Sequence, residues 1–309
     1  GNTKCRCNAV DERRIGDYVM SLLARLSPFM ALCLFVYFST EATTSNDDEE
    51  TDLSNETCLE CHETIEIDSA EVDLAEHLGA SIHEGLECID CHADITESPH
   101  EEEKLAAVDC GSCHEDEKAD YQKHGHLQTG QNVDLPSCAS CHGTHDILPS
   151  SDKNSRVSHL NLPKTCGHCH EDIDLTTKHE NLYGEAVTLY KSSVHGMAAA
   201  EGIDTVALCN NCHFVDGSAH KIYEAGDKLS KTNHFNIPST CGQCHKQELD
   251  DYWGGIHGKL VADGKTNSPV CTNCHGEHGI ISPSDPRSAV SPARVAEATC
   301  APCHESAYL

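Results

Sequence analysis

The chain has 309 residues, of which 21 are cysteine, 23 are histidine and only 5% are aromatic, and its formal net charge is −30. This charge excludes nucleic-acid binding, which needs a basic footprint, and gives no attraction to anionic lipid. A chain so acidic and so poor in apolar side chains does not build an ordinary hydrophobic core. The excess of cysteine and histidine indicates that another group supplies the core.

The first 42 residues predict a leader that is absent from the mature protein. Met20 precedes an apolar stretch over Leu26–Phe38. This stretch is shorter than the roughly 20 residues of a transmembrane helix but suits the apolar region of a signal peptide. Residues 40–42 offer a cleavage site, so we expect a signal peptide over about residues 20–42 and export to the periplasm or the extracellular space. An uncleaved N-terminal anchor is the alternative.

The segment 43–57 predicts an acidic linker, because NDDEETD at 46–52 is a dense run of charge. The mature domain then covers residues 58–309. Short helical turns over Ser69–Leu78 and Gly184–Ser192 are expected there, among loops rich in Gly, Pro, Ser and Asp.

Eighteen of the cysteines fall into nine copies of the pattern CxxCH, which is the attachment site of a c-type heme. Two thiols at this spacing add to the two vinyl groups of one porphyrin, and the next histidine lies beneath the iron as the proximal ligand. Nine hemes c are therefore expected on Cys58, Cys61, Cys88, Cys91, Cys110, Cys113, Cys138, Cys141, Cys166, Cys169, Cys209, Cys212, Cys241, Cys244, Cys271, Cys274, Cys300 and Cys303. The expected proximal ligands are His62, His92, His114, His142, His170, His213, His245, His275 and His304.

Two other uses of paired cysteines compete with this interpretation. Exported proteins form disulfides, and CxxC pairs bind structural zinc. Neither use requires a histidine after every second cysteine. The three remaining cysteines, Cys5, Cys7 and Cys33, all lie in the predicted leader.

With these nine motifs, and with phrases such as SVHG at 193–196 and CTNCHGEHGI at 271–280, the chain resembles the periplasmic and extracellular multiheme c-type cytochromes with doubled CxxCH motifs. The resemblance covers Cys58 to His304. It implies a heme-packed fold of loops and short α-helices with little or no β-sheet. It also implies electron transfer along closely spaced hemes.

The motifs form a repeat of two-heme units. After a first heme at 58–62, units are expected at about 77–120, 121–180, 190–250 and 252–309. Three units share one order: a tyrosine, a histidine 14 residues before the next cysteine, a first CxxCH, another histidine and a second CxxCH. We expect the aromatic side chains at the start of these units to pack on porphyrin edges: Tyr121, Tyr190, Tyr252 and Trp253.

The repeat also predicts the distal ligands. Met197 is the single methionine outside the leader, so His/Met ligation is open to one heme at most. We expect distal ligation by His77, His83, His100, His124, His145, His195, His220, His257 and His278. His159 and His234 also recur, but the third unit has Ala293 at that position, which favours a supporting role. The heme at 300–304 has no histidine after it, so it takes His257 or His278, keeps an open position, or receives a ligand from another chain.

These features predict electron transfer through nine mainly bis-histidine, low-potential hemes, between a membrane or periplasmic donor and a terminal or extracellular acceptor. The expected partners are redox proteins, such as a quinol-oxidising membrane complex, other cytochromes or a terminal reductase, and self-assembly is a further option. No nucleic acid or small-molecule substrate is expected.

Two alternatives stay open. One is a subunit of a polymeric extracellular cytochrome filament. The other is a multiheme oxidoreductase acting on nitrogen or sulfur oxyanions, which needs an iron with an open position. The surplus of histidine and the lack of a CxxCK motif argue against an enzyme.

Overall fold

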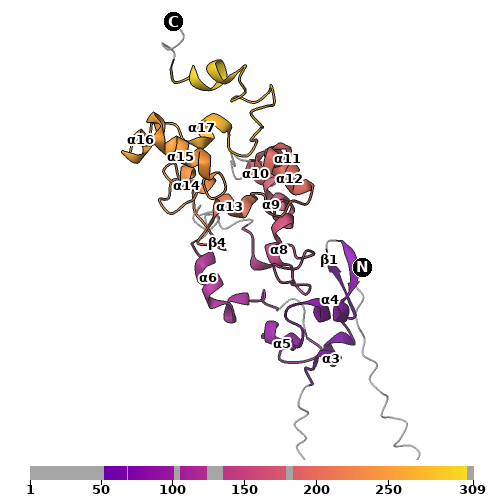
Figure 1. Cartoon of the computed structure of the whole chain (residues 1–309). Helices are drawn as coiled ribbons and strands as arrows, with labels where there is room; N and C mark the ends of the chain where they lie inside the picture. Colours follow the sequence, from indigo (N-terminus) through magenta and orange to yellow (C-terminus); the bar gives the residue numbers. More distant parts are fainter. Residues whose placement is uncertain (1–51, 68, 101–104, 124–134, 179–183, 305–309) are drawn as a thin grey trace, which may run out of the picture. The chain divides into compact units, whose positions relative to one another are not determined.

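Short helices joined by long loops make up most of the chain (Figure 1). The structure is a computed structural model that describes residues 52–67, 69–100, 105–123, 135–178 and 184–304. The α-helices of these ranges are α3 (Asn55–Leu59), α4 (Leu74–Ala80), α5 (Cys88–Cys91), α6 (Glu115–Tyr121), α8 (Cys138–His142), α9 (Leu162–His170), α10 (Ile173–Lys178), α11 (Ala186–Ser192), α12 (Val194–Ala200), α13 (Cys209–His213), α14 (Ile237–Cys241), α15 (Lys246–Gly254), α16 (Ile256–Ala262) and α17 (Cys271–His275). Two 3₁₀ turns, η2 (Cys110–Ser112) and η3 (His159–Asn161), and one π-helical turn, η4 (Val295–Cys300), complete them.

The described residues divide into two compact units. Unit 1 takes residues from 1–63 and 87–106, and unit 2 takes residues from 64–86 and 107–309. In unit 1, the amide of Cys88 at the start of α5 donates to Oδ1 of Asn55 in α3 at 2.7 Å. This bond ties the first two CxxCH motifs together. Unit 2 holds the other seven motifs and all the strands.

Two antiparallel hairpins form the sheets of the described chain. β1 (Thr64–Ile67) pairs with β2 (Ala70–Asp73), and Ile65 lies opposite Val72. The expectation of helix over Ser69–Leu78 is therefore wrong for 70–73, because the two short alternating segments pair with each other. Helix begins only at Leu74, where Asp73 accepts the amide of Glu76 at 2.8 Å as an N-cap.

The second hairpin follows a CxxCH motif directly. It joins β3 (Phe214–Val215) to β4 (Ser218–Ile222), and α6 packs against β4. Lys221 Nζ on β4 lies 3.1 Å from Oδ2 of Asp120 on α6. The helix expected over Gly184–Ser192 is confirmed as α11 (Ala186–Ser192).

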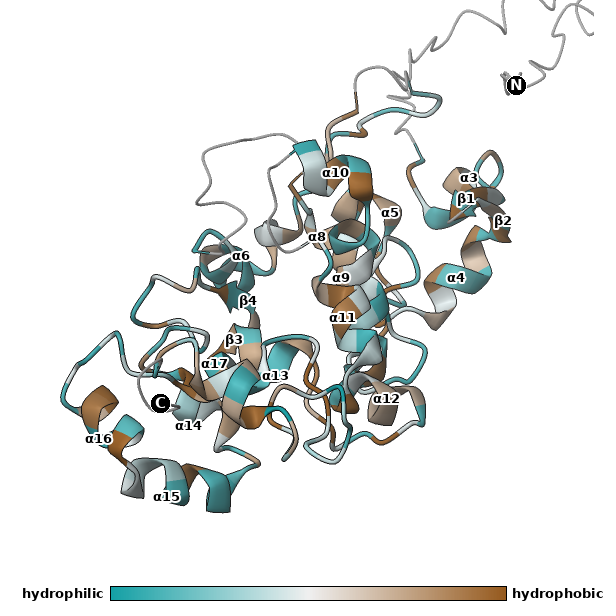
Figure 2. Cartoon of the chain, turned by 90° about the horizontal axis from the view of Figure 1, so that it is seen from above, coloured by the Kyte–Doolittle hydropathy of each residue, from teal (hydrophilic) through white to brown (hydrophobic). Residues whose placement is uncertain are grey.

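Few apolar side chains are buried in the described chain. They are Leu74, Leu162, Val187, Leu208, Val215, Val261 and Val270, and they are matched by nine buried hydroxyl side chains. Figure 2 shows hydrophobic and hydrophilic turns next to each other along helices such as α16. The expected architecture of loops and short helices with little sheet is confirmed, and side-chain burial alone builds no continuous core in it.

The tyrosine that opens each repeat holds the loop before the first CxxCH motif. The hydroxyl of Tyr190 donates to the carbonyl of Ala207 at 3.0 Å, and that of Tyr252 donates to Pro269 at 3.0 Å. Tyr121 donates to Pro136 in the same way. The acceptor lies two residues before the first cysteine in all three units. A bond from a side chain to the backbone, which the sequence does not predict, thus fixes the loop just before the motif.

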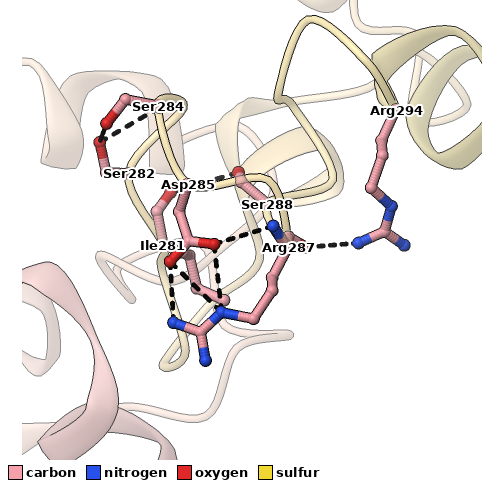
Figure 3. Close-up of polar contacts among 7 residues, drawn as sticks. All are labelled: Ile281, Ser282, Ser284, Asp285, Arg287, Ser288 and Arg294. Carbon is pink, nitrogen blue, oxygen red and sulfur yellow. Dashed lines mark hydrogen bonds and ion pairs between the residues drawn. The ribbon is translucent and has the colours of Figure 1, made fainter.

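The loop before the second CxxCH motif is also repeated. A serine Oγ donates to the carbonyl seven residues earlier at 3.1–3.4 Å: Ser155 to Leu148, Ser230 to Tyr223 and Ser288 to Ile281. These serines are 2–3% exposed, so their bonds are shielded from water. Figure 3 shows the third copy, where Arg294 donates to the carbonyl of Arg287. Asn161 and Asn236 bond to loop carbonyls in the other two copies.

The glycine that follows the first histidine of a repeat, Gly196 or Gly258, allows two helices to pack closely. A Cβ at Gly258 would overlap the carbonyl oxygen of Tyr252 and lie 2.8 Å from its carbonyl carbon, and Gly196 meets Tyr190 in the same way. Helices α15 and α16 therefore pack at a distance that only glycine permits.

We expect Gly258→Ala to destabilise the holoprotein by about 1–3 kcal/mol, because the added methyl group forces the two helices apart. Gly254→Ala is the matched control, since a Cβ there has nothing within 4 Å. Denaturant unfolding followed at the heme absorbance measures both. Equal stability of the two variants would contradict the packing argument.

Candidate heme-binding sites

Each CxxCH motif closes one helical turn. The amide of the motif histidine donates to the carbonyl of the first cysteine in motifs 1, 2, 3, 7 and 9, at 2.9–3.0 Å. The other four motifs lie inside α8, α9, α13 and α17. Residues i, i+3 and i+4 of a helical turn share one face. Both thiols and the imidazole of a motif are therefore presented on the same side, as attachment to one porphyrin requires.

The structure brings six predicted proximal histidines opposite six predicted distal histidines. The ring centroids in every pair are 5.9–6.2 Å apart: His62–His100, His114–His83, His142–His220, His213–His278, His245–His195 and His304–His257. Centroid separations of about 6 Å lie within the range of about 4.5–7 Å found for neighbouring aromatic rings, so the near-constancy of the distance is more informative than its size. The distance recurs in pairs that are otherwise unrelated in sequence spacing.

The spacing fits one iron between two imidazoles. A metal–imidazole bond is about 2 Å long, and the ring centroid lies about 1 Å behind the bonding nitrogen, so two axial rings on one iron have centroids about 6 Å apart. The interplanar angles range from 5° to 69°. Both extremes suit axial ligation, because each ring can turn about its own iron–nitrogen bond. The residues present thus fit bis-histidine heme.

Burial keeps several of these imidazoles in the form that binds metal. Burial, assisted by His278 and His170, lowers the pKa of His213 to about 4. Burial also lowers the pKa values of His142, His195 and His278 below their usual range. A neutral imidazole offers a free nitrogen lone pair to iron, so burial favours the protonation state of these histidines that ligates iron.

One pairing rule applies within a repeat. The histidine at the start of the unit faces the histidine of the second motif of that same unit. The pairs His83–His114, His195–His245 and His257–His304 follow it. At the motif 300–304, the upstream histidine that faces His304 is thus His257 and not His278.

A second rule applies between repeats. The histidine that follows the first motif of a unit faces the first-motif histidine of the preceding unit. His220 faces His142 in this way, and His278 faces His213. His100 faces His62 of the lone first motif by the same rule. Successive repeats therefore interlock.

A backbone bond accompanies this interlocking. The amide of Val194, one residue before His195, donates to the carbonyl of Ile280, two residues after His278, at 2.9 Å. The amide of Ile82 donates to Ile147 at 2.7 Å in the equivalent place. Each bond joins the start of one unit to the segment that carries the distal histidine of the next unit.

The remaining predicted ligands are not all brought together. His124 lies outside the described residues, and the pairing of His92, His145 and His170 stays a prediction. His77 on α4, the expected ninth distal ligand, faces no histidine ring in the part of the chain that the structure describes. His275 likewise faces none there.

The two surplus recurring histidines have other neighbours. Nε2 of His159 lies 3.2 Å from the carbonyl of Val206. The ring of His234 packs edge-on against Phe235, with centroids 5.2 Å apart. Neither ring faces a predicted proximal histidine in the described ranges, which agrees with a supporting role.

Consecutive motifs lie next to each other along unit 2. Helix α9 contacts α13, α13 contacts α14, and α14 contacts α17. The Cys166 thiol donates a hydrogen bond to Cys209, which holds the pKa of Cys166 above its usual range, and Cys241 does the same toward Cys271. The second cysteines of the two motifs in one repeat also lie near each other. Burial, followed by the neighbouring Cys169, raises the pKa of Cys141.

The same order holds at the two ends of the series. Burial, with Cys110 beside it, raises the pKa of Cys138. Burial, with Cys300 and Cys303 nearby, raises that of Cys274. In the compact unit 1 of residues 1–63 and 87–106, burial and the neighbouring Cys58 raise the pKa of Cys88 to about 11. Motifs 3 to 9 therefore follow one another in space in the order of the sequence.

The described cysteines are all free thiols in the structure. No group of three or more His, Cys, Asp or Glu side chains in the described ranges is arranged to hold a metal ion directly. None of the described helices is both long enough and apolar enough to cross a membrane.

One protein family matches the chain. The model of the family described as outer membrane cytochrome MtrC/MtrF-like, domains II/IV, aligns with residues 81–258. The alignment includes motifs 2 to 7 and the histidine at 257. No curated protein and no solved structure matches the chain.

We expect His195→Ala to convert one heme, the one at 241–245, from low-spin to high-spin while it stays covalently attached, because only the facing imidazole is removed. Electron paramagnetic resonance of the oxidised protein and intact mass measure the two effects. His234→Ala is the control and leaves the spectrum unchanged. A fully low-spin spectrum for His195→Ala, with no replacement ligand, would contradict the pairing.

Proposed function

This chain belongs to the MtrC/MtrF-like family of outer membrane cytochromes, and on that basis we propose that it conducts electrons through nine c-type hemes, each held by a CxxCH motif and most of them ligated by two histidines. Membership of this family makes the chain a multiheme cytochrome that takes part in extracellular electron transfer. The number of hemes, their ligands and the route between them are our proposal.

The ordered series of motifs 3 to 9 is the observation that carries the proposal. Electron transfer between hemes requires neighbours that are nearly in contact, and each motif of this series adjoins the next. When bound, heme supplies an iron that accepts and returns one electron. The chain's own residues hold the porphyrins in sequence and keep both axial positions filled by imidazole.

Two-histidine ligation is what separates a carrier from an enzyme here. An enzyme needs an iron position that substrate can reach. Six facing pairs leave no such position at their hemes. The proposal is therefore electron transfer without substrate chemistry at these six hemes.

The acidic surface supports docking to basic redox partners. With a net charge of −30, the chain attracts a positively charged patch over about 8–10 Å at physiological ionic strength. We propose that it receives electrons from another cytochrome or a quinol-oxidising complex and delivers them outside the cell. Association weakens as salt is added.

We expect all heme potentials to lie well below that of a His/Met cytochrome c, because two imidazoles stabilise ferric iron better than imidazole with thioether. Spectroelectrochemistry should give one broad, overlapping reduction wave. A major component at strongly positive potential would contradict bis-histidine ligation.

We also expect rapid reoxidation of every heme when the fully reduced protein meets an iron oxide particle, which is too large to touch each heme directly. Removing the sixth heme by Cys209→Ala with Cys212→Ala interrupts the series, so reoxidation should become biphasic. Removing the last heme by Cys300→Ala with Cys303→Ala leaves the rest contiguous and keeps one phase. Stopped-flow absorbance measures both variants, and a single phase in the first would argue against a linear route.

A further inference from the structure

We propose that the ion pair between Asp120 and Lys221 positions His220 as the distal ligand of the heme on the motif at 138–142. Asp120 and Lys221 are positioning residues, because they act through the strand that carries His220. The inference rests on the proposed bis-histidine function and adds to it the contact that makes one of the six pairings specific.

The segment that carries His220 differs from its counterparts in the other repeats. In the second and fourth units, a histidine follows the histidine of the first motif by three residues, whereas His220 follows His213 by seven. The longer segment folds into the hairpin of β3 and β4. Its two-residue turn has positive φ at Asp216 (54°) and Gly217 (74°), as the tightest antiparallel hairpins require. The position of His220 therefore depends on what holds β4.

Lys221 anchors β4 to helix α6. Its Nζ lies 3.1 Å from Oδ2 of Asp120, and the two side chains are only 23% and 25% exposed, which limits screening of the pair by water and salt. Figures 1 and 2 both show α6 beside β4. Successive side chains of a strand point to opposite faces. Lys221 therefore reaches α6 while the ring of His220 faces that of His142, with centroids 6.1 Å apart.

Helix α6 also holds the other side of this site. Its next residue, Tyr121, donates from its hydroxyl to the carbonyl of Pro136, just before the motif that contains His142. Asp120 and Tyr121 are adjacent in the chain. One short segment thus holds both the strand with the distal histidine and the loop before the proximal motif.

The equivalent positions of the next junction between repeats are also in contact. Leu189, like Asp120, precedes the tyrosine of its repeat, and Gly279, like Lys221, follows a distal histidine. A Cβ at Gly279 would lie 3.5 Å from Cδ2 of Leu189, an ordinary van der Waals distance. The same two positions therefore meet at both junctions, through an apolar contact in one and through opposite charges in the other.

The ion pair takes the place of a backbone bond. At the next junction, the amide of Val194 donates to the carbonyl of Ile280 at 2.9 Å. The corresponding amide of the earlier junction belongs to Lys123, and it donates within its own turn to the carbonyl of Asp120 at 3.0 Å. The repeat at 190–250 is thus held on the one before it by a side-chain contact, which a single substitution can remove.

Removing either charge tests the inference. Asp120→Asn and Lys221→Met should each loosen β4, so that His220 leaves the iron more readily. Carbon monoxide uptake by the reduced holoprotein should then gain a fast phase of one heme per chain relative to wild type, and the oxidised protein should gain high-spin signal. Unchanged uptake and spin state in both variants would overturn the inference. Either variant decides if the other fails to mature, because both remove the same pair.

Conservative variants separate positioning from general stability. Asp120→Glu and Lys221→Arg keep the ion pair and should retain the wild-type uptake. Asp116→Asn is the matched control, because it removes the same charge from an exposed position of α6. A fast phase of equal size in Asp116→Asn, or one spread over several hemes, would trace the effect to net charge or to general loosening and would overturn the inference.

His220→Ala locates the effect and separates the inference from the proposed function. It should open the heme at 138–142 on its own, and Asp120→Asn added to it should open no further heme. Additive uptake in the double variant would overturn the positioning role. If His220→Ala itself leaves every heme unchanged, the histidine pair fails instead, and with it the proposed bis-histidine function at this heme.

Discussion

Two imidazoles that face each other with centroids about 6 Å apart are the interaction on which the rest of the structure depends. The gap is wide enough for an iron between the two rings. Because only seven apolar side chains are buried in the described ranges, the chain gains little from its own burial. We propose that porphyrins between these pairs supply the apolar area that the side chains lack.

The pairs also explain how short helices hold their positions. Helices of four to nine residues are marginal in water by themselves. In the proposed holoprotein, each motif turn is anchored by two thioethers and an iron bond. In three repeats, a tyrosine hydroxyl bonds to the loop before the first motif and a serine hydroxyl bonds within the loop before the second. Since half of the pairs cross from one repeat to the next, no repeat is complete alone, as in other repeat proteins whose neighbours share an interface.

The sequence alone identifies the CxxCH motifs and the histidine excess and predicts an architecture of loops and short helices, because the spacing within a CxxCH motif is a local property of the chain. It did not predict which histidines pair. His142 and His220 are 78 residues apart, and nothing local joins them. The ninth distal ligand illustrates this limit: proximity in sequence predicts His77, and that assignment stays a prediction, whereas the six facing pairs follow the order of the units. The sequence does not predict the hairpin at 64–73, because each of its strands is too short to be recognised before the two are paired.

The repeat also contains residues whose roles become clear only in the structure. Packing of Tyr121, Tyr190 and Tyr252 on porphyrin edges stays a prediction, and the structure adds that their hydroxyl groups bond to the backbone two residues before a motif. The constant spacing of tyrosine and cysteine could have indicated this role. The serine that precedes each second motif could have been found in the same way, since Ser155, Ser230 and Ser288 recur at matching positions.

An anomalous difference map, collected at the iron edge from crystals of the holoprotein, tests the central claim most directly. The account predicts one iron peak midway between the two rings of each of the six facing pairs. An iron peak that is absent between any of these pairs, or that lies beside a different axial side chain, would contradict it.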